Sequence, residues 1–211
     1  MNNSHSAKRA RKPLNPRKTP GQSRSGETVA AILEGAAHIL EGPGLASYNT
    51  NAIAARAGVS IGSLYQYFPG KDAITLALIE RESAGLVGEI DSALRLENPK
   101  QALRAMIGAA VRHQLRRPKL ARLLDIEQER LAGVIPASSH AASARAMLIA
   151  FLRRAYGLRE PKISDAVLDL MEIVRALTDA AGRREKVDAG PLVKHIEGAV
   201  LGYLDARRRT D

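Results

Sequence analysis

The chain has 211 residues, enough for one large or two small domains with a buried core. Aromatic residues are scarce, and the abundance of Leu, Ala, Ile, Arg and Glu favours helices over strands. The absence of Cys excludes disulfides, thiol catalysis and the common structural zinc sites. No apolar region follows the basic start as a secretory signal would require, and no stretch approaches the ~20 apolar residues of a membrane span. We therefore expect a cytoplasmic protein.

The net charge of +10 is unevenly distributed. Residues 1–26 contain seven Lys or Arg and no acid, and they are rich in Pro, Ser and Asn. Residues 27–80 contain only two bases, Arg56 and Lys71, against five acids. The first segment cannot form a core and predicts a basic, flexible arm. It is either a solvated tail or an arm that follows DNA.

Apolar spacing and turn signals predict the first four helices. The expected ranges are 27–40, 50–57, 60–68 and 71–96. Gly42-Pro43-Gly44 ends the first helix, and Asn49 or Thr50 caps the second. Gly58 turns the chain, Ser60 caps the third helix, and Pro69-Gly70 stops it.

The remainder of the chain also predicts helices only. Asn98 followed by Pro99 and Gln101 is a well-formed helix start. Pro118 begins a helix that reaches about residue 131, and Ser138 or Ser139 begins one that ends at Gly157. Ser164 is expected to cap a helix that extends to residue 182, and Gly190-Pro191 to open the last one, to about residue 208. The fold class is all-α, with about nine helices and no internal repeat.

Residues 50–68 carry the spacing of a helix-turn-helix, in which the second helix enters the major groove. The contact positions between the two helices are small or apolar: Ile53, Ala54, Ala57, Val59 and Leu64. Gly58 lies where the turn requires a residue that tolerates positive φ. A helical hairpin of an ordinary core needs the same apolar spacing, but it does not explain a polar outer face on the second helix.

That outer face predicts contacts to bases and phosphates. Gln66 suits a bidentate contact to adenine, and Ile61 suits the thymine methyl group. Tyr65, Tyr67 and Lys71 suit phosphates, which fix register without reading sequence. The predicted DNA-binding residues are Asn49, Thr50, Asn51, Ser60, Ile61, Gly62, Ser63, Tyr65, Gln66, Tyr67 and Lys71.

The segment AARAGVSIGSLYQYFPGK, residues 54–71, resembles the signature of TetR-type (tetracycline-repressor-like) regulators. The resemblance covers residues 27–80 and implies a three-helix DNA-binding domain with phosphate contacts from Tyr65, Tyr67 and Lys71. Two positions depart from the family pattern: Ser63 replaces the usual Thr, and Tyr48-Asn49 replaces a Thr pair before the second helix. After the basic arm that composition predicts over 1–26, the resemblance implies a DNA-binding domain over 27–81 and an effector-binding and dimerisation domain over 82–211.

For the second domain, the family resemblance implies a homodimer formed by the last two helices and a pocket for an unknown small molecule. Apolar stripes on these helices include Ile163 and Val167, then Ile196 and Val200, although such stripes bury a core face in any helical domain. If the face through Val200 is the dimer seam, Val200→Glu should weaken the dimer, because a buried charge would be left unpaired. Dimerisation lets two helix-turn-helix units read a palindromic operator in double-stranded DNA. The pocket candidates, each also a plausible core residue, are Leu103, Met106, Ile107, Ala110, Leu124, Met147 and Phe151. We expect Glu127 to pair with a nearby Arg such as Arg130.

Two other classes of function remain as alternatives. The five His residues show no metal-ligand spacing, and neither a phosphate-binding loop nor a nucleophile elbow is present. We therefore expect no catalytic residue, no metal and no cofactor. A constitutive or architectural DNA-binding dimer shares every feature of the first domain. A closed cavity of ligand size, ~300 Å³ or more, in the second domain would distinguish an effector-controlled repressor from it.

Overall fold

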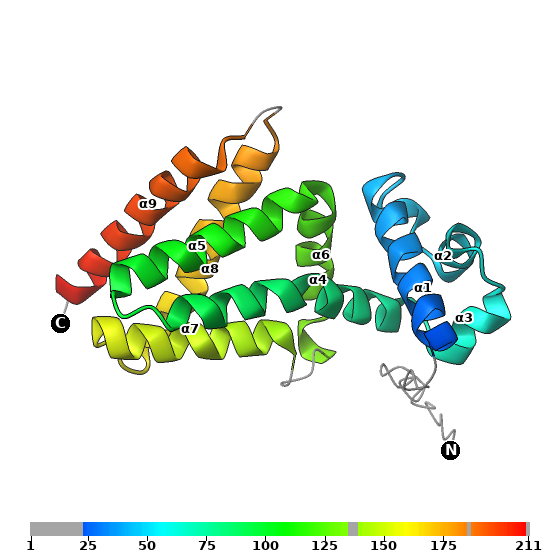
Figure 1. Cartoon of the computed structure of the whole chain (residues 1–211), viewed down its shortest axis with the longest axis horizontal. Coiled ribbons are helices and arrows are strands. Elements are labelled where there is room, and N and C mark those ends of the chain that lie inside the picture. Colours follow the sequence, from blue (N-terminus) through cyan, green and yellow to red (C-terminus); the bar gives the residue numbers. More distant parts are fainter. Residues whose placement is uncertain (1–22, 135–138, 185–186, 210–211) are drawn as a thin grey trace, which may run out of the picture. The chain divides into compact units, whose positions relative to one another are not determined.

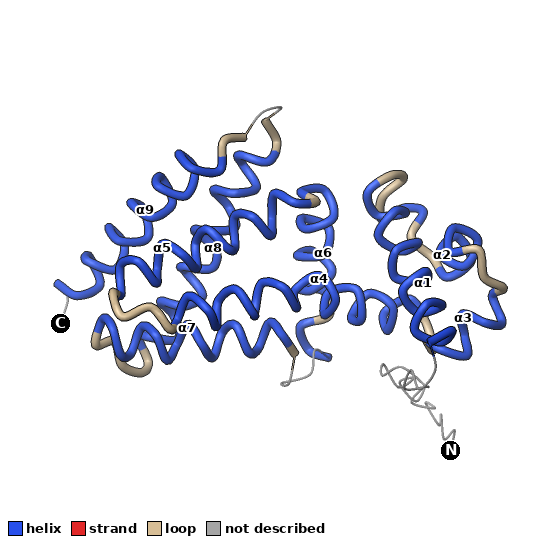
Figure 2. Tube along the Cα trace, viewed as in Figure 1, coloured by secondary structure: helices blue, strands red, loops and turns tan. Residues whose placement is uncertain are grey.

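The computed structural model describes residues 23–134, 139–184 and 187–209. In those residues the secondary structure comprises nine α-helices and two short 3-10 turns, with no strand (Figures 1 and 2), which confirms the predicted all-α class. The helices are α1 (Ser23–Glu41), α2 (Thr50–Ala57), α3 (Ile61–Tyr67), α4 (Lys71–Leu94), α5 (Pro99–Arg116), α6 (Pro118–Arg130), α7 (His140–Tyr156), α8 (Lys162–Gly182) and α9 (Ala189–Arg209). The chain divides into two compact units, and the boundary falls between Leu78 and Ile79, inside α4.

The helix termini follow from specific capping residues. Asn98 accepts hydrogen bonds from the backbone N–H groups of Lys100 and Gln101, at 2.9 and 3.2 Å, and Pro99 occupies the first turn of α5. Ser139 accepts from the N–H of Ala142 at 3.1 Å and so caps α7. These caps confirm the expected starts of both helices.

Two predicted helix starts were wrong. α1 begins at Ser23 rather than near residue 27, so its first turn uses residues that we had assigned to the arm. Ser164 lies inside α8 rather than at its cap, and its hydroxyl donates to the carboxylate of Glu160 at 2.9 Å. The remainder of the predicted arm, residues 1–22, lies outside the described residues.

The first unit is built around one buried face of each short helix. Ile32 and Leu40 of α1, Ile53 of α2 and Leu64 of α3 are all fully buried. α1 approaches α2 closely at Gly35, where an added Cβ would lie 3.0 Å from the backbone N of Ala57. The absence of a side chain at this position therefore lets the two helices pack.

In the second unit, α5, α8 and α9 pack against one another around a single core. The apolar stripes of α8 and α9 face this core: Val167 is 0% exposed and Val200 is 1% exposed. The expectation that Val200 marks a dimer seam is therefore wrong, because this side chain packs within its own chain. α8 and α9 are further joined by Arg207, which donates to Tyr203 at 2.8 Å and to Asp169 at 2.9 Å.

None of the described helices is both long and apolar enough to cross a bilayer.

Candidate DNA-binding surface and effector cavity

The geometry between α2 and α3 is that of a helix-turn-helix. Asn49 caps α2 by accepting from the N–H of Ala52 at 3.0 Å, which settles the choice between Asn49 and Thr50. Gly58 ends α2 with φ 69°, in the left-handed region that favours glycine. Ser60 then caps α3 by accepting from the N–H of Ser63 at 3.0 Å.

The outer face of α3 presents large side chains to solvent. Ile61 is 39% exposed and Tyr65 is 41% exposed, and Gln66 and Gly62 are also exposed. An Ile, a Tyr and a Gln are thus exposed on one short helix of the first unit. They are among the side chains that the sequence predicts to contact DNA.

The remaining predicted DNA contacts lie around this face and are partly held in place. Thr50 and Tyr65 are joined through their hydroxyls at 3.2 Å, across the helix-turn-helix. Ser60 and Ser63 bond to each other at 2.8 Å, so their hydroxyls already serve the helix cap. Asn49 and Asn51 are exposed, whereas Ser63, Tyr67 and Lys71 are half-buried.

Tyr48 is a residue that the sequence did not lead us to assign. Its ring lies under the ammonium group of Lys71, 5.7 Å from the ring centre, and its buried hydroxyl bonds to Thr75 at 3.0 Å. The cation–π contact orients Lys71 at the N-terminus of α4. We had noted Tyr48 only as a departure from the family pattern; an aromatic residue before the capping Asn was the available signal.

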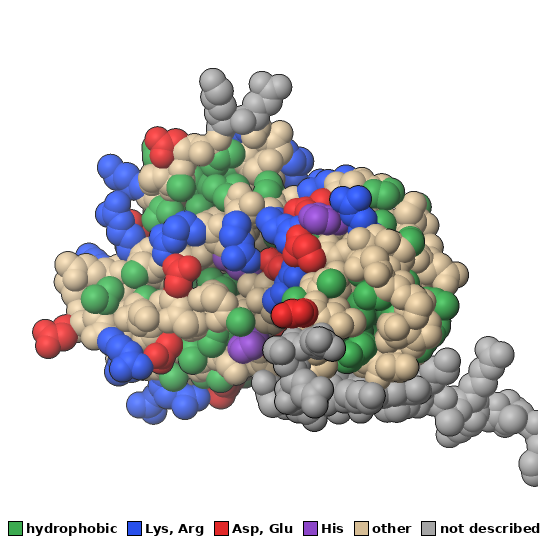
Figure 3. Space-filling model, turned by 45° about the vertical axis from the view of Figure 1, so that its right-hand side comes forward, with side chains coloured by type: hydrophobic (Ala, Val, Ile, Leu, Met, Phe, Trp, Pro, Cys, Tyr) green, Lys and Arg blue, Asp and Glu red, His purple; other side chains and the backbone are tan. Residues whose placement is uncertain are grey.

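Charged side chains do not form a single basic patch on the face shown in Figure 3, where Lys and Arg are interspersed with Asp and Glu. In residues 27–80 the acids outnumber the bases.

The second unit contains a cavity of about 420 Å³, within the ~300–1,000 Å³ range typical of small-ligand sites. Four of the seven predicted pocket residues line it: Leu103, Met106, Ile107 and Ala110. Further apolar wall residues come from α4, α7 and α8, for example Leu86, Leu148 and Met171, and polar residues of α5 and α6 also line the cavity.

The other three predicted pocket residues lie elsewhere. Leu124 lines a smaller adjoining cavity of about 40 Å³. Met147 is half-buried on α7, and Phe151 is 2% exposed in the core, edge-on to Tyr156. Neither lines either cavity.

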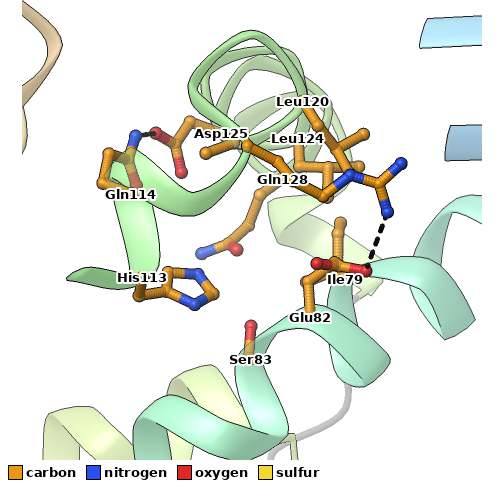
Figure 4. A pocket seen from close by; sticks show the side chains of 11 residues that line it. Ile79, Glu82, Ser83, His113, Gln114, Leu120, Leu124, Asp125 and Gln128 are labelled. Carbon is orange, nitrogen blue, oxygen red and sulfur yellow. Dashed lines mark hydrogen bonds and ion pairs between the residues drawn. The ribbon is translucent and has the colours of Figure 1, made fainter. Parts of the chain in front are cut away.

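The smaller cavity is a polar extension of the larger one, since both are lined by Ser83, His113, Gln114, Asp125 and Gln128 (Figure 4). Gln114 donates to Asp125 at 3.0 Å, and burial raises the pKa of this carboxyl group despite that bond. Burial lowers the pKa of His113, and the nearby Arg116 lowers it further. Glu127 is buried nearby on α6 and binds Arg130 at 2.6 Å, as expected.

Comparison with known proteins matches both units to one family. Residues 32–78 match the model for bacterial regulatory proteins of the tetR family, and residues 98–204 match the tetracyclin repressor-like C-terminal domain. The chain belongs to the TetR family. Membership confirms the resemblance found in the sequence to this family of bacterial regulatory proteins.

Individual relatives match part of the chain. The nucleoid occlusion factor SlmA of Glaesserella parasuis is 33% identical over 81 residues, which cover 38% of this chain and 40% of SlmA. The transcriptional repressor KstR of Mycobacterium tuberculosis is 32% identical over 101 residues, 47% of this chain and 46% of KstR. The chain thus spans less than half the length of these curated relatives.

Solved structures extend the match to most of the fold. The fatty acid degradation regulator FadR of Bacillus halodurans superposes with a TM-score of 0.71 at 19% identity, covering 82% of this chain and 94% of FadR. FadR of Bacillus subtilis, solved in complex with stearoyl-CoA, gives 0.69 at 16% identity, covering 81% and 96%. At these identities the likeness concerns the fold.

Proposed function

We propose that this TetR-family protein is a repressor that binds palindromic operator DNA as a homodimer and is released by a small molecule bound in the second unit. The observation that supports DNA recognition most directly is the exposed surface of α3, which carries Ile61, Tyr65 and Gln66. The repressor KstR and the regulator FadR among its relatives support the same role. A protein that acts on bacterial DNA works in the cytoplasm, and we propose that location.

We assign distinct roles to the DNA-facing residues. Gln66 and Ile61 read bases, because an amide pairs with adenine and an aliphatic side chain meets the thymine methyl group. Tyr65, Tyr67 and Lys71 bind phosphates and set the register. Gly62, where an added Cβ would meet only the hydroxyl of Ser60 at 3.8 Å, lets the backbone approach the groove.

For the dimer we propose the outward faces of α8 and α9. Leu168 and Met171 of α8 are 52% and 40% exposed, although both are large and apolar, and both also line the cavity. On α9 the exposed positions include Gly198, Ala199 and Gly202, which allow a second helix to approach closely. These faces replace the buried stripe through Val200 as the seam.

The cavity of about 420 Å³ supports an effector rather than a constitutive DNA-binding role. Helices of one unit line it, it is partly open to solvent, and the surface of its wall is mostly apolar, as in binding sites for small molecules. A constitutive dimer would need no such cavity. We also propose a binding rather than a catalytic role, because the relatives are regulators.

Selection of bound sites from random duplex DNA tests the proposal. The expected product is a palindrome whose half-sites lie ~34–36 Å apart, one helical turn, or a multiple of this. Light scattering of the same sample should show a dimer. Recovery of an unrelated, non-palindromic pool, or binding of a monomer to a half-site, would contradict the dimeric operator-binding role.

A further inference from the structure

At the polar end of the cavity, Gln114 is the shared neutral partner of two carboxylates, of which Asp125 lines the cavity and Asp179 lies behind Gln114 outside the lining. The amide nitrogen of Gln114 donates to Asp125 at 3.0 Å and to Asp179 at 2.9 Å. In the described part of the chain, no Lys or Arg forms an ion pair with either acid. Two carboxylates therefore meet at one amide without an ion-paired cation.

The two arginines that line the cavities are already paired with other acids. Arg175, the single Lys or Arg in the described lining of the larger cavity, donates to Glu129 at 2.8 Å and to Glu172 at 2.6 Å, and its charge also acts on Asp125. Arg117, which lines the smaller cavity, lies 3.9 Å from Glu82. Burial and Arg116 lower the pKa of His113, so this imidazole is neutral near pH 7. The lining of the larger cavity thus contains three carboxylates against one guanidinium.

Most of the remaining wall is apolar and aliphatic. Leu86, Ile90, Leu103, Met106 and Val174 are among its residues, and no Phe, Tyr or Trp of the described chain lines it. An aromatic cage for a quaternary ammonium is therefore lacking there. A primary ammonium has three donors that can reach carboxylate oxygens directly.

We infer that the effector is an apolar molecule that carries a protonated amine, bound with its ammonium group against Asp125 and its apolar part between α4, α5 and α8. The inference rests on the proposed function of this cavity as the effector site. An anionic ligand, such as a carboxylate or an acyl-CoA, would bring negative charge to an end that is already acidic, and a buried charge without an opposite partner is costly. The preferred ligand therefore differs in charge from the stearoyl-CoA bound by Bacillus subtilis FadR.

Three probes of equal chain length separate charge from apolar burial: octylamine, 1-octanol and octanoate. Calorimetry of the full-length protein at pH 7 should show octylamine binding roughly tenfold or more tightly than 1-octanol, with octanoate weakest, because desolvated charge pairs contribute strongly to binding. Asp125→Asn should remove the advantage of the amine and leave 1-octanol binding unchanged. That unchanged binding also shows that the variant folds. Asp91→Asn, which removes an exposed acid of α4 paired with Arg95, is the matched control and should change neither.

The raised pKa of Asp125 gives a second readout. When the pH falls through this pKa the carboxyl group becomes neutral, so octylamine affinity should decrease while 1-octanol affinity stays constant. The charges of Glu129, Arg175 and Asp179 also act on Asp125. In Asp125→Asn the part of the pH dependence that belongs to Asp125 disappears, which isolates it from these neighbours.

The failure of this inference differs from a failure of the proposed function. Three results would overturn the inference even if operator DNA is bound. They are binding of octanoate or stearoyl-CoA that equals or exceeds that of octylamine, absence of octylamine binding, and an unaltered preference for octylamine in Asp125→Asn. Ala110→Leu, which fills the wall of the cavity, should weaken both octylamine and 1-octanol. Amine binding that survives this substitution places the ligand elsewhere and also overturns the inference. Failure to retain any operator DNA would instead contradict the proposed function.

Discussion

Gly35 is the position where a single added methyl group should disturb the DNA-binding unit most clearly. A Cβ at this position would lie 3.0 Å from the backbone N of Ala57, 3.2 Å from the Cβ of the same residue, and 3.2 Å from the carbonyl O of Ile53. Two of these three atoms belong to the backbone of α2 and cannot rotate away. Gly35→Ala must therefore push α1 and α2 apart.

The sign of the effect follows from two opposing magnitudes. Overpacking of a closely packed interface costs ~1–3 kcal/mol. Replacement of glycine by alanine inside a helix contributes ~0.5–1 kcal/mol in the other direction. We therefore expect a net loss of stability of about 1 kcal/mol, which corresponds to a decrease of roughly 2–4 °C in Tm for a chain of this size.

Gly88→Ala in α4 is the matched control, because nothing lies within 4 Å of an added Cβ at that position. Its Tm should rise, since only the helix-propensity gain applies. Thermal unfolding followed by circular dichroism measures both variants, and gel retardation with operator DNA should show weaker binding for Gly35→Ala alone. If both variants gain stability equally, the close approach of α1 and α2 does not limit this interface, and the reasoning fails.

Three further predictions concern DNA binding and assembly. Gln66→Ala should relax the base preference at one position of each half-site, with a loss of ~1–3 kcal/mol in binding free energy. Lys71→Ala should weaken binding to all DNA sequences about equally. The reverse pattern in site selection would exchange the roles of the two residues. Residues 1–22 contain six Lys or Arg, and their deletion should flatten the slope of log K against log salt by several units per dimer, at ~0.9 for each phosphate that the segment neutralises. The preferred DNA site should stay unchanged. An unaltered slope would show that the segment does not contact DNA. Nothing in its own chain lies within 4 Å of a Cβ added at Gly202, so Gly202→Leu should keep α9 intact. Light scattering should show that the variant dimer dissociates. A stable dimer would place the dimer interface elsewhere.

The fold was predictable because each helix has a local signature. The caps at Asn98 and Ser139 and the left-handed glycines at 58 and 157 are encoded within a few residues of the helix they end or begin. Ser164 was assigned wrongly because a Ser inside a helix and a Ser at its cap look alike in sequence. The hydroxyl that we expected at a cap instead bonds to the carboxylate of Glu160, one turn earlier.

The site was predictable only where neighbouring residues share one short helix. Ile61, Tyr65 and Gln66 follow from the spacing of α3, but the role of Tyr48 depends on Lys71 and Thr75, which are distant in sequence. The same limit applies to the cavity. A periodic apolar stripe does not show whether its residues face a void, a partner or their own core, so Val200 was assigned to a seam although it is buried.

Continuity of α4 provides the physical basis for coupling between ligand and operator. Lys71 begins this helix, and Ser83, Leu86 and Ile90 of the same helix line the cavity. A ligand shifts DNA affinity only if it binds the DNA-free state more tightly than the DNA-bound state, and operator DNA must then weaken the ligand by the same factor. An amine that fills the cavity equally well in both states would satisfy Asp125 and still leave the operator occupied. Tight binding alone therefore does not define the effector, and calorimetry with and without operator DNA is the decisive comparison: equal affinities would exclude the compound as an inducer.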